Sequence, residues 1–206
     1  MSINHVKKMK ILLDNGHGEN TGGKRSPRWA DGSQLFEWAY TREIAKRVEL
    51  ELKKHGVDVE RIVPENNDIS LSERCRRANV IADKVGVKNC LLVSIHNNAS
   101  QNEKAQGWEI HTYLGTSKSD EYATVFWNTA KELLPTRVNK MRGDWSDGDP
   151  DWDSNFGILR GTKCAAVLTE NLFMDNENDC RFLLSEEGKA VITQIHVQAI
   201  LKIVGK

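Results

Sequence analysis

The sequence has no long apolar run and no excess of charge, and each absence excludes a class of protein. No stretch reaches 18 consecutive apolar residues, and residues 1–10 are charged without the apolar core of a signal peptide, so neither a membrane span nor an export signal is predicted. Lys and Arg total 29 against 29 Asp and Glu, which leaves no basic surface for nucleic acid or an anionic membrane. We therefore expect no nucleic-acid partner and no membrane insertion.

Cysteine is also scarce, and several catalytic motifs are missing. The four cysteines are widely spaced without a C-x-x-C pair, and Cys90 and Cys164 lie in or beside apolar segments, as buried thiols do. This distribution favours a reduced interior over a disulfide framework. The sequence contains no H-E-x-x-H, G-x-S-x-G or Walker motif. Any catalytic site must therefore be assembled from residues that are far apart in the sequence.

The 206 residues suit one domain, because 39% are hydrophobic and no shift in composition marks a boundary. Short apolar runs of strand length alternate with helical patterns over residues 35–56, 71–85 and 119–134, which predicts an α/β fold. We expect a single domain over residues 1–206 in which residues 1–9 form a flexible lead-in, and we expect a monomer.

Two apolar runs each end at a histidine. Residues 90–99 read CLLVSIHNNA, and this nearly continuous apolar stretch predicts a strand covered on both faces, with His96 at its carboxyl end. Residues 10–18 read KILLDNGHG and show the same pattern, a short apolar strand followed by a histidine, His17. Ligands of open α/β sheets bind at the carboxyl edge of the strands. The two histidines therefore indicate one shared site, whereas either alone could simply cap a strand.

Two glutamates are candidates for the same site. Glu37 opens a helical pattern among apolar neighbours, although an acidic residue in a first helical turn also stabilises the helix. Glu170 ends the apolar strand 165–171. Two imidazoles and one carboxylate form a catalytic zinc set that leaves a place for water, and a second carboxylate can move the proton. His111 is a further possible ligand, but its alternating strand favours a half-buried histidine with a hydrogen-bond partner.

An irregular segment, residues 141–155, contains Trp145 and Trp152 among several aspartates. Exposed indoles here would offer flat surfaces to a sugar or a peptide, and the alternative is a surface loop held in place by two aromatic side chains.

Several segments together resemble a known family. The segments, in chain order, are 13–18 (LDNGHG), 35–37 (LFE), 70–74 (SLSER), 94–99 (SIHNNA), 107–109 (GWE), 156–160 (FGILR), 166–171 (AVLTEN) and 173–176 (FMDN). They resemble the motif series of the zinc-dependent N-acetylmuramoyl-L-alanine amidases of type 3. The resemblance implies a twisted, mostly parallel or mixed β-sheet flanked by helices on both faces.

The resemblance also implies a function. His17, Glu37 and His96 would bind Zn²⁺, and Glu170 would activate the zinc-bound water that cleaves the amide between N-acetylmuramic acid and L-alanine in peptidoglycan. Asn97 and Arg160 are expected to contact the substrate and to stabilise the oxyanion, with Trp145 and Trp152 as further substrate-binding residues.

Two other functions remain open at this stage. One is a zinc peptidase or deacetylase that acts on another amide, and the other is a cell-wall-binding module without catalysis. As an amidase, the chain would be an autolysin or an endolysin. It would be made in the cytoplasm and reach the wall after release, or it would be an exported protein whose leader has been removed.

Overall fold

Among the residues that the structure describes, six strands form one mixed sheet, which confirms the predicted fold class. The computed structural model describes residues 9–100 and 103–206, so the expected lead-in 1–9 lies outside the described residues except for Met9. The strands are β1 (Lys10–Asn15), β2 (Asp58–Arg61), β3 (Cys90–Asn98), β4 (Glu109–Thr112), β5 (Trp152–Asp153) and β6 (Ala165–Phe173). The helices are α1 (Glu37–Lys54), α2 (Leu71–Val85), α3 (Lys118–Leu133), α4 (Gly157–Gly161), α5 (Glu177–Leu184) and α6 (Glu186–Val204), with a 3₁₀ turn at Val87–Asn89.

The order of the strands brings the ends of three apolar segments together. Across the sheet the strands run β2-β1-β3-β6-β4-β5. The first four are parallel, β4 is antiparallel to β6, and β5 is parallel to β4. Because β1, β3 and β6 are adjacent and parallel, their carboxyl ends lie at one edge of the sheet. Trp152, on the short edge strand β5, is half-buried, which corrects the expectation that its indole is exposed.

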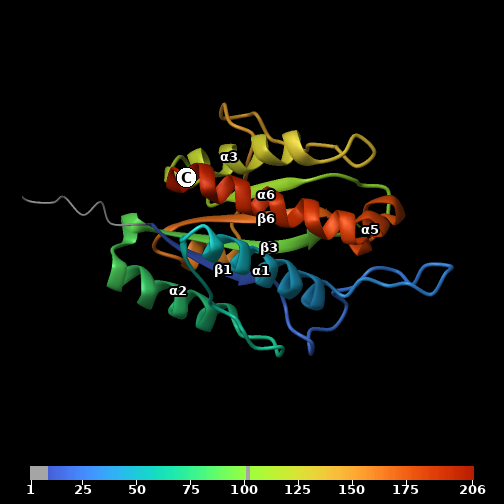
Figure 1. Ribbon diagram of the computed structural model, residues 1–206, viewed down its shortest axis with the longest axis horizontal. Helices are drawn as coiled ribbons and strands as arrows, with labels where there is room; N and C mark the ends of the chain where they lie inside the picture. The colour runs from blue at the N-terminus through green and yellow to red at the C-terminus, as the bar shows by residue number, and fades with distance from the viewer. Residues whose placement is uncertain (1–8, 101–102) are drawn as a thin grey trace, which may run out of the picture.

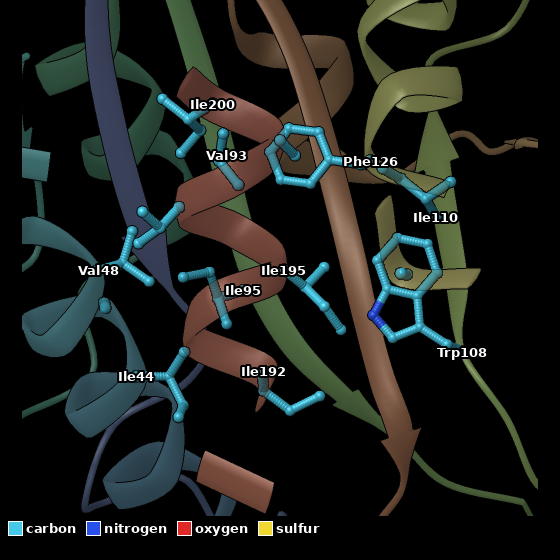
Figure 2. Packing of buried hydrophobic residues seen from close by; sticks show 14 of the residues in the cluster. Ile44, Val48, Val93, Ile95, Trp108, Ile110, Phe126, Ile192, Ile195 and Ile200 are labelled. Carbon is cyan, nitrogen blue, oxygen red and sulfur yellow. The ribbon is translucent and has the colours of Figure 1, made fainter. Parts of the chain in front are cut away.

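Helices cover both faces of the sheet, as Figure 1 shows for α1, α3 and α6 on one side and α2 on the other. Strand β3 is buried on both faces, as its apolar run predicted. Val93 and Ile95 pack in the larger core with α1, α3 and α6, whereas Leu92 packs in the smaller core with α2 and α4. Figure 2 shows the larger core, in which side chains of α1 and α6 enclose those of β3. Burial of each such aliphatic side chain contributes roughly 1.5–3 kcal/mol to the free energy of folding.

The helix ends follow from the local sequence. The Ser70 side chain accepts a hydrogen bond from the backbone N–H of Glu73 and caps α2. Ser117 and Asp120 form a reciprocal capping box at the start of α3. All four cysteines are free thiols, as expected. Among the described residues, no helix has the length and apolar character needed to cross a bilayer.

Candidate metal centre and active site

The structure brings His17, Glu37, His96 and Glu170 to one place, the carboxyl edge of the parallel strands. His17 lies two residues after β1, and Glu37 is the first residue of α1. His96 and Glu170 are direct neighbours in the register of β3 and β6. The structure therefore brings the two strand-end histidines together, as their positions indicated.

The geometry of the three predicted ligands suits a small divalent cation. The His17 Nε2 atom lies 3.2 Å from Glu37 Oε2, and His96 Nδ1 lies 3.1 Å from Glu37 Oε1. The two imidazole rings are 5.1 Å apart and perpendicular. One nitrogen or oxygen atom of each residue lies within 4.8 Å of the others. In tetrahedral zinc sites with bonds of about 2.0–2.1 Å, neighbouring ligand atoms are about 3.3 Å apart.

The surroundings of Glu37 keep its carboxylate ionised inside the protein. Its side chain is 1% exposed, and Oε1 accepts a hydrogen bond from the backbone N–H of Asn97. Burial alone would raise the pKa of Glu37, but the imidazoles of His17 and His96 beside it outweigh that effect and hold the pKa well below its usual range. Oε2 is buried, and the His17 imidazole 3.2 Å away does not reach it with hydrogen-bond geometry, so this oxygen has no hydrogen-bond partner. A cation between the imidazoles would satisfy this oxygen, so the ligand set fits zinc.

Two arginines hold the loop that carries His17. The Arg42 guanidinium donates to the carbonyl oxygens of Gly16 and His17, at 3.3 and 2.8 Å. Arg74 donates to the carbonyl oxygens of Asn15 and His17, at 2.7 and 3.0 Å. Both arginines are buried. The sequence analysis did not identify them as site residues, although Arg74 ends one of the family-like segments.

Gly16 and His17 have backbone requirements of their own. A Cβ atom at Gly16 would lie 2.4 Å from Cε1 of His96, so only glycine permits the imidazole to come this close. His17 has a φ of 60°, in the left-handed region that side chains other than glycine rarely adopt. The arginine contacts to the preceding carbonyls stabilise this conformation.

Glu170 lies beside the ligands but is not one of them. Its Oε2 atom is buried and has no hydrogen-bond partner. Burial raises the pKa of Glu170 to about 8, with His96 opposing the rise and Glu37 and Glu109 adding to it. A bound cation would add a nearby positive charge and lower this pKa again. A carboxyl group in such an environment can both accept and donate a proton near neutral pH.

His111 is not part of the metal cluster, as the sequence analysis favoured. Its Nδ1 atom is 2.8 Å from the hydroxyl of Ser154, and its Nε2 atom is 3.5 Å from Glu109. Within residues 9–100 and 103–206, the set His17, Glu37 and His96 is the only group of three or more metal-binding side chains with this spacing. The candidate ligand set therefore consists of two histidines and one glutamate, without His111.

Asn97 contacts the cluster, whereas Trp152 lies on the edge strand β5, which β4 separates from β6. The Asn97 side chain donates to the backbone oxygen of Asn171 at 2.7 Å, so its amide faces away from Glu37 while its backbone N–H contacts that residue. The Trp152 indole donates to the backbone oxygen of Arg142 at 3.1 Å. Asn97 therefore contacts the candidate ligand Glu37 through its backbone N–H and not through its side-chain amide.

Trp145 and Arg160 are placed elsewhere. Trp145 is 59% exposed and packs against the ring of Trp127 in α3. Arg160 donates to Asn155 and lines a cavity of about 570 Å³ at the opposite, amino-terminal end of β3 and β6. The structure does not bring either side chain to the four clustered residues, and their expected contacts with substrate stay predictions.

A smaller cavity adjoins the two imidazoles. Its volume is about 230 Å³, and its lining includes Asp68, Leu71 and Ile158 together with His17 and His96. The candidate ligands therefore border an open space that a substrate group can enter.

Comparison with known proteins finds similar sequences. A family model described as N-acetylmuramoyl-L-alanine amidase, Amidase_3, matches residues 11–202. The endolysin of Bacillus phage SPP1 is 29% identical over 197 residues, which are 94% of this chain and 65% of the endolysin. The probable cell wall amidase LytH of Staphylococcus epidermidis is 27% identical over 203 residues, 97% of this chain and 60% of LytH. The chain thus spans less than two thirds of the length of either relative.

Solved structures are similar over nearly the full chain. The crystal structure of an N-acetylmuramoyl-L-alanine amidase from Clostridium difficile 630 has a TM-score of 0.79 and 25% identity, and the match covers 97% of this chain and 98% of that one. The amidase AmiC2 of Nostoc punctiforme has a TM-score of 0.76 and 24% identity with the same coverage, which supports the fold.

Proposed function

The chain belongs to the Amidase_3 family of N-acetylmuramoyl-L-alanine amidases, and from this premise we propose that it is a zinc-dependent hydrolase of peptidoglycan. The bond cleaved would be the amide between N-acetylmuramic acid and the L-alanine of the stem peptide. The observation that carries the proposal is the convergence of His17, Glu37 and His96 with Glu170 beside them. The chain would act on the bacterial cell wall.

His17, Glu37 and His96 would hold the zinc ion. A zinc ion in such a three-ligand site polarises a carbonyl group and lowers the pKa of water to about 7. The orphaned Oε2 atom of Glu37 supports this assignment, because a buried carboxylate oxygen without a partner costs free energy unless a cation or a donor reaches it. Asn97 would keep the Glu37 carboxylate in place through its backbone N–H.

Glu170 would move the proton. Its Oε2 atom would accept a proton from the attacking water and then donate it to the alanine nitrogen as the amide bond breaks. Both transfers suit a carboxyl group whose burial raises its pKa toward neutrality. The neighbouring strand position of His96 keeps Glu170 within reach of the metal ligands without making it one of them.

The proposal can be tested on purified peptidoglycan. The zinc-loaded chain should release soluble peptides that carry a new amino-terminal alanine, and a chelator should stop the release. Glu187→Gln, which changes an exposed carboxylate that is paired with Arg137 on the surface, should behave like the wild type. A different new terminus would identify a zinc peptidase, and released acetate would identify a deacetylase. Binding to the wall without a soluble product would identify a wall-binding module.

A further inference from the structure

The segment 141–155 runs beside the start of β4 at Arg142. The backbone N–H of Arg142 donates to the carbonyl oxygen of Trp108 at 3.0 Å, and the Arg142 carbonyl accepts from the Trp152 indole at 3.1 Å. These contacts fix the main chain of Arg142 beside β4. The sequence analysis gave this segment no role for Arg142.

A buried glutamate orients the Arg142 side chain. Glu109 lies opposite Glu170 in the antiparallel register of β4 and β6 and is 6% exposed. One of its carboxylate oxygens accepts from the Asn98 amide at 2.8 Å, and the other accepts from Nε of Arg142. Burial opposes the charge of Glu109, but His111 and Arg142 outweigh it and lower its pKa. Both carboxylate oxygens of Glu109 thus accept hydrogen bonds, and the carboxylate holds the guanidinium of Arg142 in place.

The end of the guanidinium is left available. The Arg142 side chain is 42% exposed, and its central carbon lies 5.2 Å from the ring of Phe173, the last residue of β6. Among the described residues, none accepts a hydrogen bond from either Nη atom of Arg142. Two parallel N–H groups in a fixed plane match the two oxygens of a carboxylate.

We propose that Arg142 binds a carboxylate in the peptide part of the substrate. The inference rests on the proposed function and adds a specificity-determining residue to it. Facing residues of antiparallel strands have Cα atoms about 4.5–5.5 Å apart, so the guanidinium held by Glu109 lies on the order of 10 Å from Glu170. An extended peptide covers about 3.3–3.6 Å per residue. That span places the carboxylate on the residues that directly follow the alanine.

Two muramyl tripeptides test the proposal, one with a free carboxylate on the second residue and one with a carboxamide there. The wild type should cleave the free form about tenfold more efficiently, mainly through KM, as one charge-assisted contact implies. Arg142→Ala should lose this preference, and Arg142→Lys should keep part of it because the charge stays while the paired geometry is lost. Zinc content and unfolding by urea show whether each variant is folded.

Arg137→Ala is the matched control. Arg137 is also an exposed arginine stacked on a phenylalanine, with its central carbon 5.3 Å from the ring of Phe182, and it pairs with Glu187 on the surface. Its replacement should leave the preference intact. If Arg142→Ala does not fold, the Lys variant carries the same comparison.

Several results would overturn the inference. The wild type could cleave both tripeptides equally, the Arg142 variants could keep the full preference, or they could lose activity equally on both substrates, which would mean that Arg142 only neutralises Glu109. These results leave the proposed function intact. If the zinc-loaded wild type cleaves neither tripeptide and also releases no amino-terminal alanine from peptidoglycan, the proposed function is wrong and this inference fails with it. Cleavage of peptidoglycan but of neither tripeptide would overturn this inference alone.

Discussion

Arg74 offers a sharp test of how the metal centre is held, because its guanidinium uses all five of its N–H groups inside the protein. The side chain is 3% exposed and donates to the carbonyl oxygens of Ile69, Asn15 and His17 and to the carboxylates of Asp14 and Asp68. Asp14 is itself 1% exposed. Arg74→Ala would therefore leave the buried Asp14 carboxylate without its cationic partner and take one donor from each of three carbonyl oxygens.

The expected cost follows from this burial. Removing one partner of a buried ion pair costs about 3–5 kcal/mol of folding free energy. Arg76→Ala, on the same helix, should lower the free energy of unfolding far less, because Arg76 is 63% exposed and pairs only with Glu73. Urea unfolding of the metal-free proteins measures the difference. Arg74→Ala should also weaken zinc binding, because the carbonyl of His17 loses one of its two arginine donors.

A third variant separates the lost pair from lost packing. Arg74→Met combined with Asp14→Leu removes both charges, and it should recover part of the stability that Arg74→Ala loses. Equal unfolding free energies for Arg74→Ala and Arg76→Ala would refute this reasoning. A double variant less stable than Arg74→Ala would show that the buried charge of Asp14 is not the main source of the cost.

Three further predictions follow. Glu170→Ala should keep its zinc and lose turnover in the peptidoglycan assay, and an active variant would remove Glu170 from the proton-transfer role. Gly16→Ala should lower zinc affinity about 10–100-fold in a chelator competition, because the new methyl group meets the His96 ring at 2.4 Å. Burial lowers the pKa of His196 from 6.5 to about 4. As the pH falls below 6.5, His196 is protonated in the unfolded chain but stays neutral in the folded protein. The free energy of unfolding is therefore highest above pH 6.5 and decreases as the pH falls toward 4. Between pH 7 and pH 5, the free energy of unfolding measured in urea should fall by about 2 kcal/mol more in the wild type than in His196→Gln.

The four clustered residues could be predicted because each is marked in the sequence by its position. His96 and Glu170 end apolar runs long enough to be buried strands, and His17 follows a third. Parallel strands put such ends at one edge of the sheet whatever their order. Glu37 was marked by its place in the first turn of a helix among apolar residues.

The supporting arginines could not be predicted in the same way. Arg42 and Arg74 lie in helices whose neighbouring residues are charged, so in the sequence they look like solvated side chains. Their burial depends on how the helices pack over the loop after β1. The pairing of Glu109 with Arg142 depends on the backbone at residues 140–142 lying alongside Trp108, which a chain-order argument does not provide.

The placement of Arg160 has a related cause. It belongs to a family-like segment just before β6, but α4 ends near the amino-terminal end of that strand, opposite to Glu170. Nearness in sequence to a strand that carries a catalytic residue therefore does not imply nearness to the site, because β6 has nine residues.

Zinc content by elemental analysis tests the central claim most directly, since the account requires His17, Glu37 and His96 to bind one ion together. We expect one zinc per chain in the wild type and in Glu170→Ala, and a loss of zinc in His17→Ala and His96→Ala. Equal zinc content in all four proteins, or full amidase activity in His17→Ala, would contradict the account.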